Sequence, residues 1–151
     1  MARLVQYTKT NIRKGNKMKK FLALFMIVSL SGCAAVDALL MTHFDPVEYR
    51  MITEIKYDAH NSIAECDDAV ASKVNANNIA YKTGLYHEYE LDIPHNEDSI
   101  KASLALDEMA QGLKTRYAGS EKINTLYCKL KFGGIESSAT LIQHVQGKRP
   151  R

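Results

Sequence analysis

Apolar positions recur along residues 45–74 with the period of a helix. They follow one another at steps of three or four residues and comprise Ile52, Ile55, Ala59, Ile63, Cys66, Val70 and Val74. A period of about 3.6 residues places such positions on one side of a helix and the charged residues between them on the other. Asp45 supplies an N-cap and Pro46 suits the first turn. The pattern therefore predicts one long amphipathic helix that starts at Pro46.

The pattern weakens at residues 75–78, Asn-Ala-Asn-Asn, which have low helix propensity. We expect the first helix to bend or break there, and residues 79–89 to continue it. Pro94 and the polar residues around it then end the pattern in a loop over residues 91–98. A break at residues 75–78 would leave a shorter first helix in the fold.

Two further amphipathic segments follow this loop. One runs from residue 98 or 99 to residue 117, and the other begins near residue 120, with the glycines at 133 and 134 expected to kink or divide it. Together the segments predict an all-α fold, a small antiparallel helical hairpin or three-helix bundle over residues 45–146. Its first and third helices are expected to lie parallel. Residues 147–151 are expected to form a frayed basic tail.

A basic and then apolar segment precedes the helical region. Lys19 and Lys20 are followed by an uncharged apolar run at residues 21–30, and a run of about ten residues has the size of a signal-peptide hydrophobic region. A membrane-spanning helix needs about 20 apolar residues, so this run alone is too short to cross a bilayer. The alternative, a signal anchor over residues 21–41, would place the charge of Asp37 in the membrane at a cost.

Residues 30–33 read Leu-Ser-Gly-Cys, with two small residues before the cysteine. This tetrapeptide resembles the lipobox of bacterial lipoproteins. The resemblance implies that residues 18–32 are a signal peptide, that a diacylglyceryl group is attached to the Cys33 sulfur, and that the new amino terminus is acylated, as with palmitate. Ala34 in place of Asp, by resemblance to Gram-negative lipoproteins, favours the outer membrane, with the domain facing the periplasm. Residues 33–44 then form a membrane-proximal segment, and no cofactor besides the covalent lipid is expected.

Residues 1–17 fit poorly in front of such a signal peptide, since they contain five basic residues and no acidic one. We interpret them as regulatory sequence ahead of a start at Met18, because the codons for Lys14 and Gly15 form a purine tract placed like a ribosome-binding site. An extended basic n-region is the alternative. Removal of residues 1–32 leaves 13 Lys and Arg against 17 Asp and Glu, so no nucleic-acid partner is expected.

Lipidation of Cys33 leaves Cys66 and Cys128 as an even pair in a chain exported to an oxidising compartment. We predict a disulfide between them, and closing a loop of about 60 residues stabilises a fold by a few kcal/mol. Two separate buried thiols or an intermolecular bridge are the alternatives. The spacing excludes a CxxC motif, which indicates a structural role for the pair.

Candidate chemistry is sparse in the helical region. His87 and His95 lie in an acidic segment and are weak candidates for a metal site, but they match no ligand motif such as HExxH. No nucleophile–base pattern is visible, so we expect no catalytic residue and no enzyme activity. Tyr81, Tyr86 and Tyr89 form a cluster of a residue type favoured at interfaces, and are the candidate partner surface. The alternative is that they line the edge of the core.

These features predict a lipid-anchored protein of the bacterial cell envelope that acts as a non-catalytic binding or accessory module. Its expected partners are the lipid bilayer, through Cys33, and an envelope protein. The alternative is a structural or lysis-type connector of the envelope, of host or phage origin. Helix length separates the two, because a compact bundle favours the binding module and one long unbroken helix favours the connector.

Overall fold

Four helices follow one another in the described part of the chain. The computed structural model describes residues 42–119 and 122–151, with α2 at Pro46–Ala64, α3 at Ala69–Leu91, α4 at Glu97–Ala118 and α5 at Thr125–Gln146. These residues contain no strand, which confirms the all-α prediction for them. Residues 1–41, which include the predicted signal peptide and the Cys33 lipidation site, lie outside the described residues.

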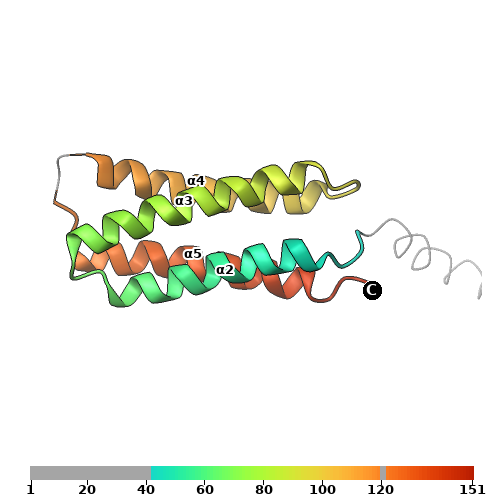
Figure 1. Cartoon of the computed structure of the whole chain (residues 1–151), viewed down its shortest axis with the longest axis horizontal. Helices are drawn as coiled ribbons and strands as arrows, with labels where there is room; N and C mark the ends of the chain where they lie inside the picture. Colours follow the sequence, from blue (N-terminus) through green and yellow to red (C-terminus); the bar gives the residue numbers. More distant parts are fainter. Residues whose placement is uncertain (1–41, 120–121) are drawn as a thin grey trace, which may run out of the picture. The chain divides into compact units, whose positions relative to one another are not determined.

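The four helices form a bundle in which successive helices run in opposite directions (Figure 1). α2 packs mainly on α5, and α3 packs mainly on α4, while contacts of α2 with α3 and of α4 with α5 close the ring. α3 and α5 therefore occupy opposite corners of the bundle. The largest apolar side chains of the core are Tyr86, Phe132, Ile52, Ile55, Ile79, Leu106, Leu113 and Ile135. Each contributes roughly 1.5–3 kcal/mol by leaving water.

The chain turns at residues 65–68, inside the single long helix that the apolar period predicted. Asp68 caps α3, because its carboxylate accepts hydrogen bonds from the backbone N–H groups of Val70 at 2.8 Å and Ala71 at 3.0 Å. The Ser72 hydroxyl donates to the carbonyl of Glu65 at 3.1 Å and holds the two sides of the turn together. The bundle therefore has four helices, not three.

The position of this turn corrects three predictions. Val70 and Val74, expected in the core, are 75% and 60% exposed, because the chain enters α3 in a new register. α3 runs unbroken through residues 75–78, where a bend or break was expected. With one helix more, the first and last helices of the bundle, α2 and α5, lie antiparallel and not parallel.

α5 is continuous through Gly133 and Gly134, where a kink or a division was expected. A Cβ atom on Gly134 would lie 3.3 Å from Met109 Cε of α4, and one on Gly133 would lie 3.9 Å from Ile63 Cδ1 of α2. The two glycines thus allow side chains of both neighbouring helices to pack close to the α5 backbone.

The two ends of the described domain lie side by side. The backbone N–H of Phe44 donates to the carbonyl of Pro150 at 2.8 Å, and Arg151 Cζ lies 5.0 Å from the centroid of the Phe44 ring. Arg149 is only 8% exposed. The tail at residues 147–151, expected to be frayed, is therefore packed against the domain.

Candidate functional site

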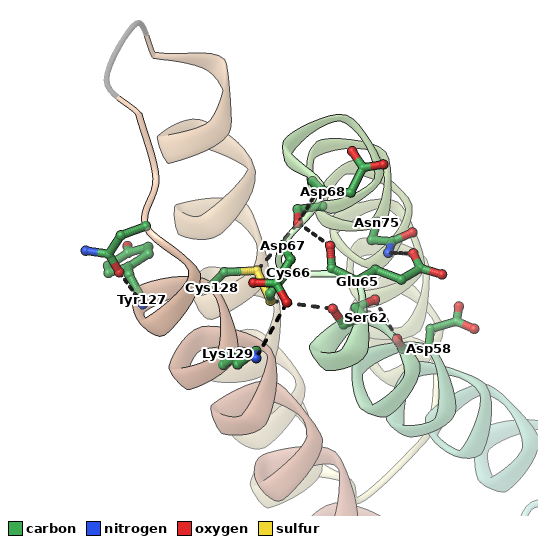
Figure 2. Close-up of a disulfide and its surroundings, with 12 residues drawn as sticks. Asp58, Ser62, Glu65, Cys66, Asp67, Asp68, Asn75, Tyr127, Cys128 and Lys129 are labelled. Carbon is green, nitrogen blue, oxygen red and sulfur yellow. Dashed lines mark hydrogen bonds and ion pairs between the residues drawn. A yellow bond between two sulfur atoms is a disulfide. The ribbon is translucent and has the colours of Figure 1, made fainter.

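A disulfide joins Cys66, in the turn after α2, to Cys128, in the first turn of α5 (Figure 2). Their Cα atoms are 5.7 Å apart, and 62 positions separate the two residues in sequence. This bond confirms the predicted pairing. Cys66 is 6% and Cys128 1% exposed, so the disulfide lies inside the fold, and its place in the core indicates a structural role.

A surface hollow with a volume of about 500 Å³ lies beside this disulfide. Its lining includes Asp67, Lys73, Tyr117 and Lys122, and Cys66 lines it as half of the disulfide. The residues that line it include neither a histidine nor a free thiol. The hollow therefore offers no thiol nucleophile and no imidazole base for covalent or acid–base chemistry.

A buried network of polar side chains occupies the other end of the bundle. Glu48 of α2 and Glu90 of α3 are each 0% exposed, and Gln146 of α5 is 2% exposed. The Gln146 amide donates to the Glu48 carboxyl, and to the Tyr86 hydroxyl at 2.5 Å. The same amide lies 3.3 Å from Glu90 Oε1, to which it also donates. The network thus links α2, α3 and α5 through side chains.

Arg149 completes this buried network from the C-terminal tail. Its Nη1 donates to Glu48 Oε2 at 2.5 Å, and its Nη2 donates to Asn96 Oδ1 at 3.0 Å and to Ser99 Oγ at 2.5 Å. The Asn96 amide in turn donates to Glu90. The planar guanidinium, with its fixed set of donors, suits such a bridge between helices. All four helices are therefore tied together at this end.

Burial changes the protonation of the network. Burial, with the hydrogen bond and negative charge of Glu90, raises the pKa of Glu48 to about 8, and Arg149 opposes this shift only in part. Glu48 therefore keeps a proton at neutral pH in the folded chain. Arg149, which donates to Glu48 Oε2, is the buried cation of the network. Burial and the neighbouring Glu90 also raise the pKa of Tyr86, so its hydroxyl stays neutral.

This buried network ties the four helices together. A carboxyl pair with a raised pKa resembles the acid–base groups of enzymes, but Glu48, Tyr86 and Glu90 are 0% exposed and a substrate in solvent does not reach them. The sequence pattern did not predict that Glu48, Glu90 and Arg149 meet in the core. Their burial was hard to predict from the sequence, because charged residues usually face solvent.

The three tyrosines of the predicted partner surface do not share one face. Tyr86 is 0% exposed and belongs to the buried network, so its assignment to a surface was wrong. Tyr89 donates its hydroxyl to Asp45 Oδ2 at 2.6 Å, at the start of α2. Of the three, Tyr81 remains on the surface, with an exposed fraction of 69%.

Two rows of exposed apolar side chains run along α3 and α5. The α3 row consists of Val70, Val74, Tyr81 and Leu85, and the α5 row consists of Leu126, Leu130, Leu141 and Val145. Every one of these side chains is more than half exposed. Because α3 and α5 occupy opposite corners of the bundle, the two rows face in different directions. Contiguous exposed apolar surface marks interaction sites, and the two rows are the candidate binding surfaces of the domain.

His87 and His95, the weak candidates for a metal site, lie in different elements of the structure. His87 Nδ1 lies 2.9 Å from Ser103 Oγ, and His95 lies in the turn before α4, with a φ of 56°. Within residues 42–119 and 122–151, no group of three or more His, Cys, Asp or Glu side chains is placed to hold a metal ion.

Within the same ranges, no helix is long and apolar enough to cross a membrane.

Comparisons with protein-family models, with curated proteins and with solved structures found no match to this chain. Function is therefore inferred from the residues and their geometry.

Proposed function

We propose that this chain is a lipoprotein of the bacterial cell envelope, held in the outer membrane by lipid on Cys33, whose helical domain faces the periplasm and binds an envelope protein without catalysis. The lipobox at residues 30–33 supplies the anchor. The observation that carries the proposal is the Cys66–Cys128 disulfide. It uses both cysteines that lipidation of Cys33 leaves over, and such bonds persist in exported proteins.

The α3 row is the surface we assign to the protein partner. Tyr81 lies within this row and is 69% exposed, and a tyrosine combines a large apolar ring with a polar tip, as binding sites favour. The row extends over residues 70–85, which is about 22 Å of helix. That length suits an amphipathic helix of the partner packed along α3.

The arrangement of the described helices supports a binding module over an envelope connector. The longest helix, α3, has 23 residues and is therefore about 35 Å long. This helix packs beside α4 and α2 in a bundle, whereas a connector across the periplasm needs one long, unbroken helix. No feature of the described residues favours the connector specifically.

Anchoring is tested by comparing the wild-type chain with a Cys33→Ser variant in cells supplied with an alkyne-tagged fatty acid. The wild-type chain is expected to take up the tag and to fractionate with the outer membrane, and the variant to do neither. A variant that stays in the membrane to the same extent would show that another segment holds the protein.

Partner binding is tested by placing a photocrosslinking amino acid at Tyr81 in the membrane-anchored protein. The matched control carries the same group at Glu108, an exposed position of α4. An envelope protein captured from position 81 and not from position 108 supports the proposal. Equal capture at both positions, or a hydrolytic activity that requires His87 or His95, would overturn it.

A further inference from the structure

Charge is divided unevenly within the helical domain. Residues 125–151, which form α5 and the tail, contain five Lys and Arg and one Glu, whereas residues 42–124 contain eight Lys and Arg and 15 Asp and Glu. Arg149 is buried in the polar network. The other basic side chains of this segment are exposed, and they are Lys129, Lys131, Lys148 and Arg151. One side of an otherwise acidic domain is therefore basic.

The α5 row lies in the middle of this basic side. Leu126, Leu130 and Leu141 are 68%, 67% and 65% exposed, and the helical period places them opposite the core residues Phe132 and Ala139. Lys129 and Lys131 are exposed, and because they are two positions apart on the helix, they flank the apolar row on its two sides. This combination is typical of helices that lie on membrane surfaces, where apolar side chains enter the interface and Lys and Arg meet lipid headgroups.

Two acidic side chains close to this surface, Glu136 and Asp67, are paired. Glu136, the acidic residue of α5, lies 3.0 Å from His60 of α2 and its side chain is 29% exposed. Asp67 lies 4.0 Å from Lys129 in an exposed ion pair, which solvent weakens. Lys131 lies 5.4 Å from the centroid of the Tyr127 ring. These contacts leave the positive side chains accessible to an anionic surface.

The point at which the chain enters the domain places this surface near the anchor. Phe44 is hydrogen-bonded to Pro150, so the segment that leads from Cys33 joins the domain beside the C-terminal end of α5. Thr42 lies nine positions after Cys33 in the sequence, and nine steps of chain span at most about 32 Å when fully extended. A lipid on Cys33 would therefore hold the end of α5 within reach of the bilayer.

We propose that the α5 row, with Lys129, Lys131, Lys148 and Arg151, is a docking face for an anionic phospholipid bilayer. The inference rests on the proposed lipid anchor, which brings the domain to the membrane. The α3 row is a poorer candidate for the same role, because α3 contains two Lys and two Glu. Its Lys82 is also engaged by Asp58 at 2.7 Å. With α5 on the bilayer, the α3 row at the opposite corner points away and stays free for a protein.

The sequence offers a direct probe of this orientation, because it contains no tryptophan. The lipidated protein is prepared with one tryptophan, as Leu130→Trp in the α5 row or as the matched control Val74→Trp in the α3 row. Each is reconstituted into vesicles of brominated phosphatidylcholine, with or without phosphatidylglycerol. In the anionic vesicles, we expect the emission of the tryptophan at position 130 to shift to the blue and to be quenched, and that at position 74 to stay unchanged.

A charge variant tests the electrostatic part of the proposal without the anchor. The mature chain from residue 33, with Cys33→Ser and Leu130→Trp, is mixed with preformed anionic vesicles. Replacement of Lys129, Lys131 and Lys148 by Gln is expected to weaken its binding on the order of a hundredfold, since each basic residue at an anionic surface contributes about fivefold. Neutral vesicles are expected to bind the parent chain and the variant equally weakly.

The outcomes separate docking from anchoring. Flotation of the wild-type protein with vesicles, together with no quenching at position 130 or equal quenching at both positions, would overturn docking and leave the anchor intact. Failure of the wild-type chain to acquire lipid, with charge-dependent quenching of the Cys33→Ser chain, would overturn the anchor and support docking. Absence of that quenching in the Cys33→Ser chain would count against docking in either case.

Discussion

Single residues hold together the end of the bundle at which the chain enters and leaves. Glu48 and Arg149 are 101 positions apart in sequence and are joined by a buried hydrogen bond that the Arg149 guanidinium donates. Glu90 approaches the same site from α3, and the raised pKa of Glu48 keeps the Glu48 carboxyl protonated at neutral pH. The cost of burying a carboxylate explains this arrangement, because an unpaired charge in the core is strongly destabilising.

The raised pKa of Glu48 predicts that the domain becomes less stable as pH increases. Its folded value is about 8 and its ordinary value is 4.5. Between these values the folded chain keeps a proton that the unfolded chain has released, so the free energy of unfolding falls by at most about 1.4 kcal/mol per pH unit. Below the ordinary pKa of 4.5, the contribution of Glu48 to the free energy of unfolding no longer changes with pH. Urea unfolding of the mature Cys33→Ser chain across the window measures this slope.

A Glu48→Gln variant is the control for this pH dependence. The glutamine has nearly the shape of the protonated glutamate and does not titrate, so we expect its stability to vary much less across the same window. A wild-type stability that stays level or rises with pH would contradict the raised pKa of Glu48.

Removal of the buried cation tests the charge balance. Arg149→Met removes the buried cation that donates to Glu48, Asn96 and Ser99, and we expect a loss of about 3 kcal/mol or more of unfolding free energy at neutral pH. Arg151→Met is the matched control, since Arg151 is exposed and its contact with the Phe44 ring is worth less than about 1 kcal/mol. Equal losses in the two variants, measured by urea unfolding, would show that Arg149 does not balance the network.

Helices and turns show how far the sequence predicts this fold. The apolar period predicted that most of these residues are helical, because each helix buries one face, but it did not predict the helix boundaries. It missed the turn at residues 65–68, since Val70 and Val74 continue the steps of three and four beyond Cys66, and a period does not reveal where a helix stops. The disulfide was predicted because lipidation of Cys33 leaves an even number of cysteines, Cys66 and Cys128. The buried network could not be predicted, because its members meet only in the folded bundle.

The cap of α3 tests what sets this turn. Asp68→Ala removes the acceptor for two backbone N–H groups and should cost about 1 kcal/mol of unfolding free energy. Asp67→Ala is the neighbouring control, since Asp67 makes only a long, exposed ion pair with Lys129 and its loss should cost less than about 0.5 kcal/mol. A larger loss for Asp67→Ala than for Asp68→Ala, in thermal unfolding, would rule out the cap as the main determinant.

The disulfide links α2 to α5 at the end opposite the buried network. A Cys66→Ser/Cys128→Ser variant should lose about 2–4 kcal/mol of stability, because the unfolded chain is no longer cross-linked. A reducing agent should lower the stability of the wild-type domain by a similar amount and leave that of the variant unchanged. Equal stability of the wild-type and variant domains under oxidising conditions would contradict a stabilising role.

At the scale of the whole molecule, we propose a lipid anchor joined to a helical bundle with two outward rows of apolar side chains. The proposed lipid on Cys33 would bring the domain to the bilayer, the α5 row and the basic side chains around it would meet anionic headgroups, and the α3 row would remain for a protein partner. The disulfide cross-links the described helices at one end of the bundle, and the buried network joins them by hydrogen bonds at the other end. Such a bundle suits a rigid binding module close to the membrane.

The covalent state of the three cysteines tests this account most directly. The protein is extracted from membranes, treated with a thiol-alkylating reagent without reduction, and its intact mass is measured. The account predicts a chain that begins at Cys33, carries a diacylglyceryl and an acyl group, and takes up no alkylating reagent, because Cys66 and Cys128 are joined. A chain that retains residues 18–32, or an alkylated Cys33 without lipid, would contradict it.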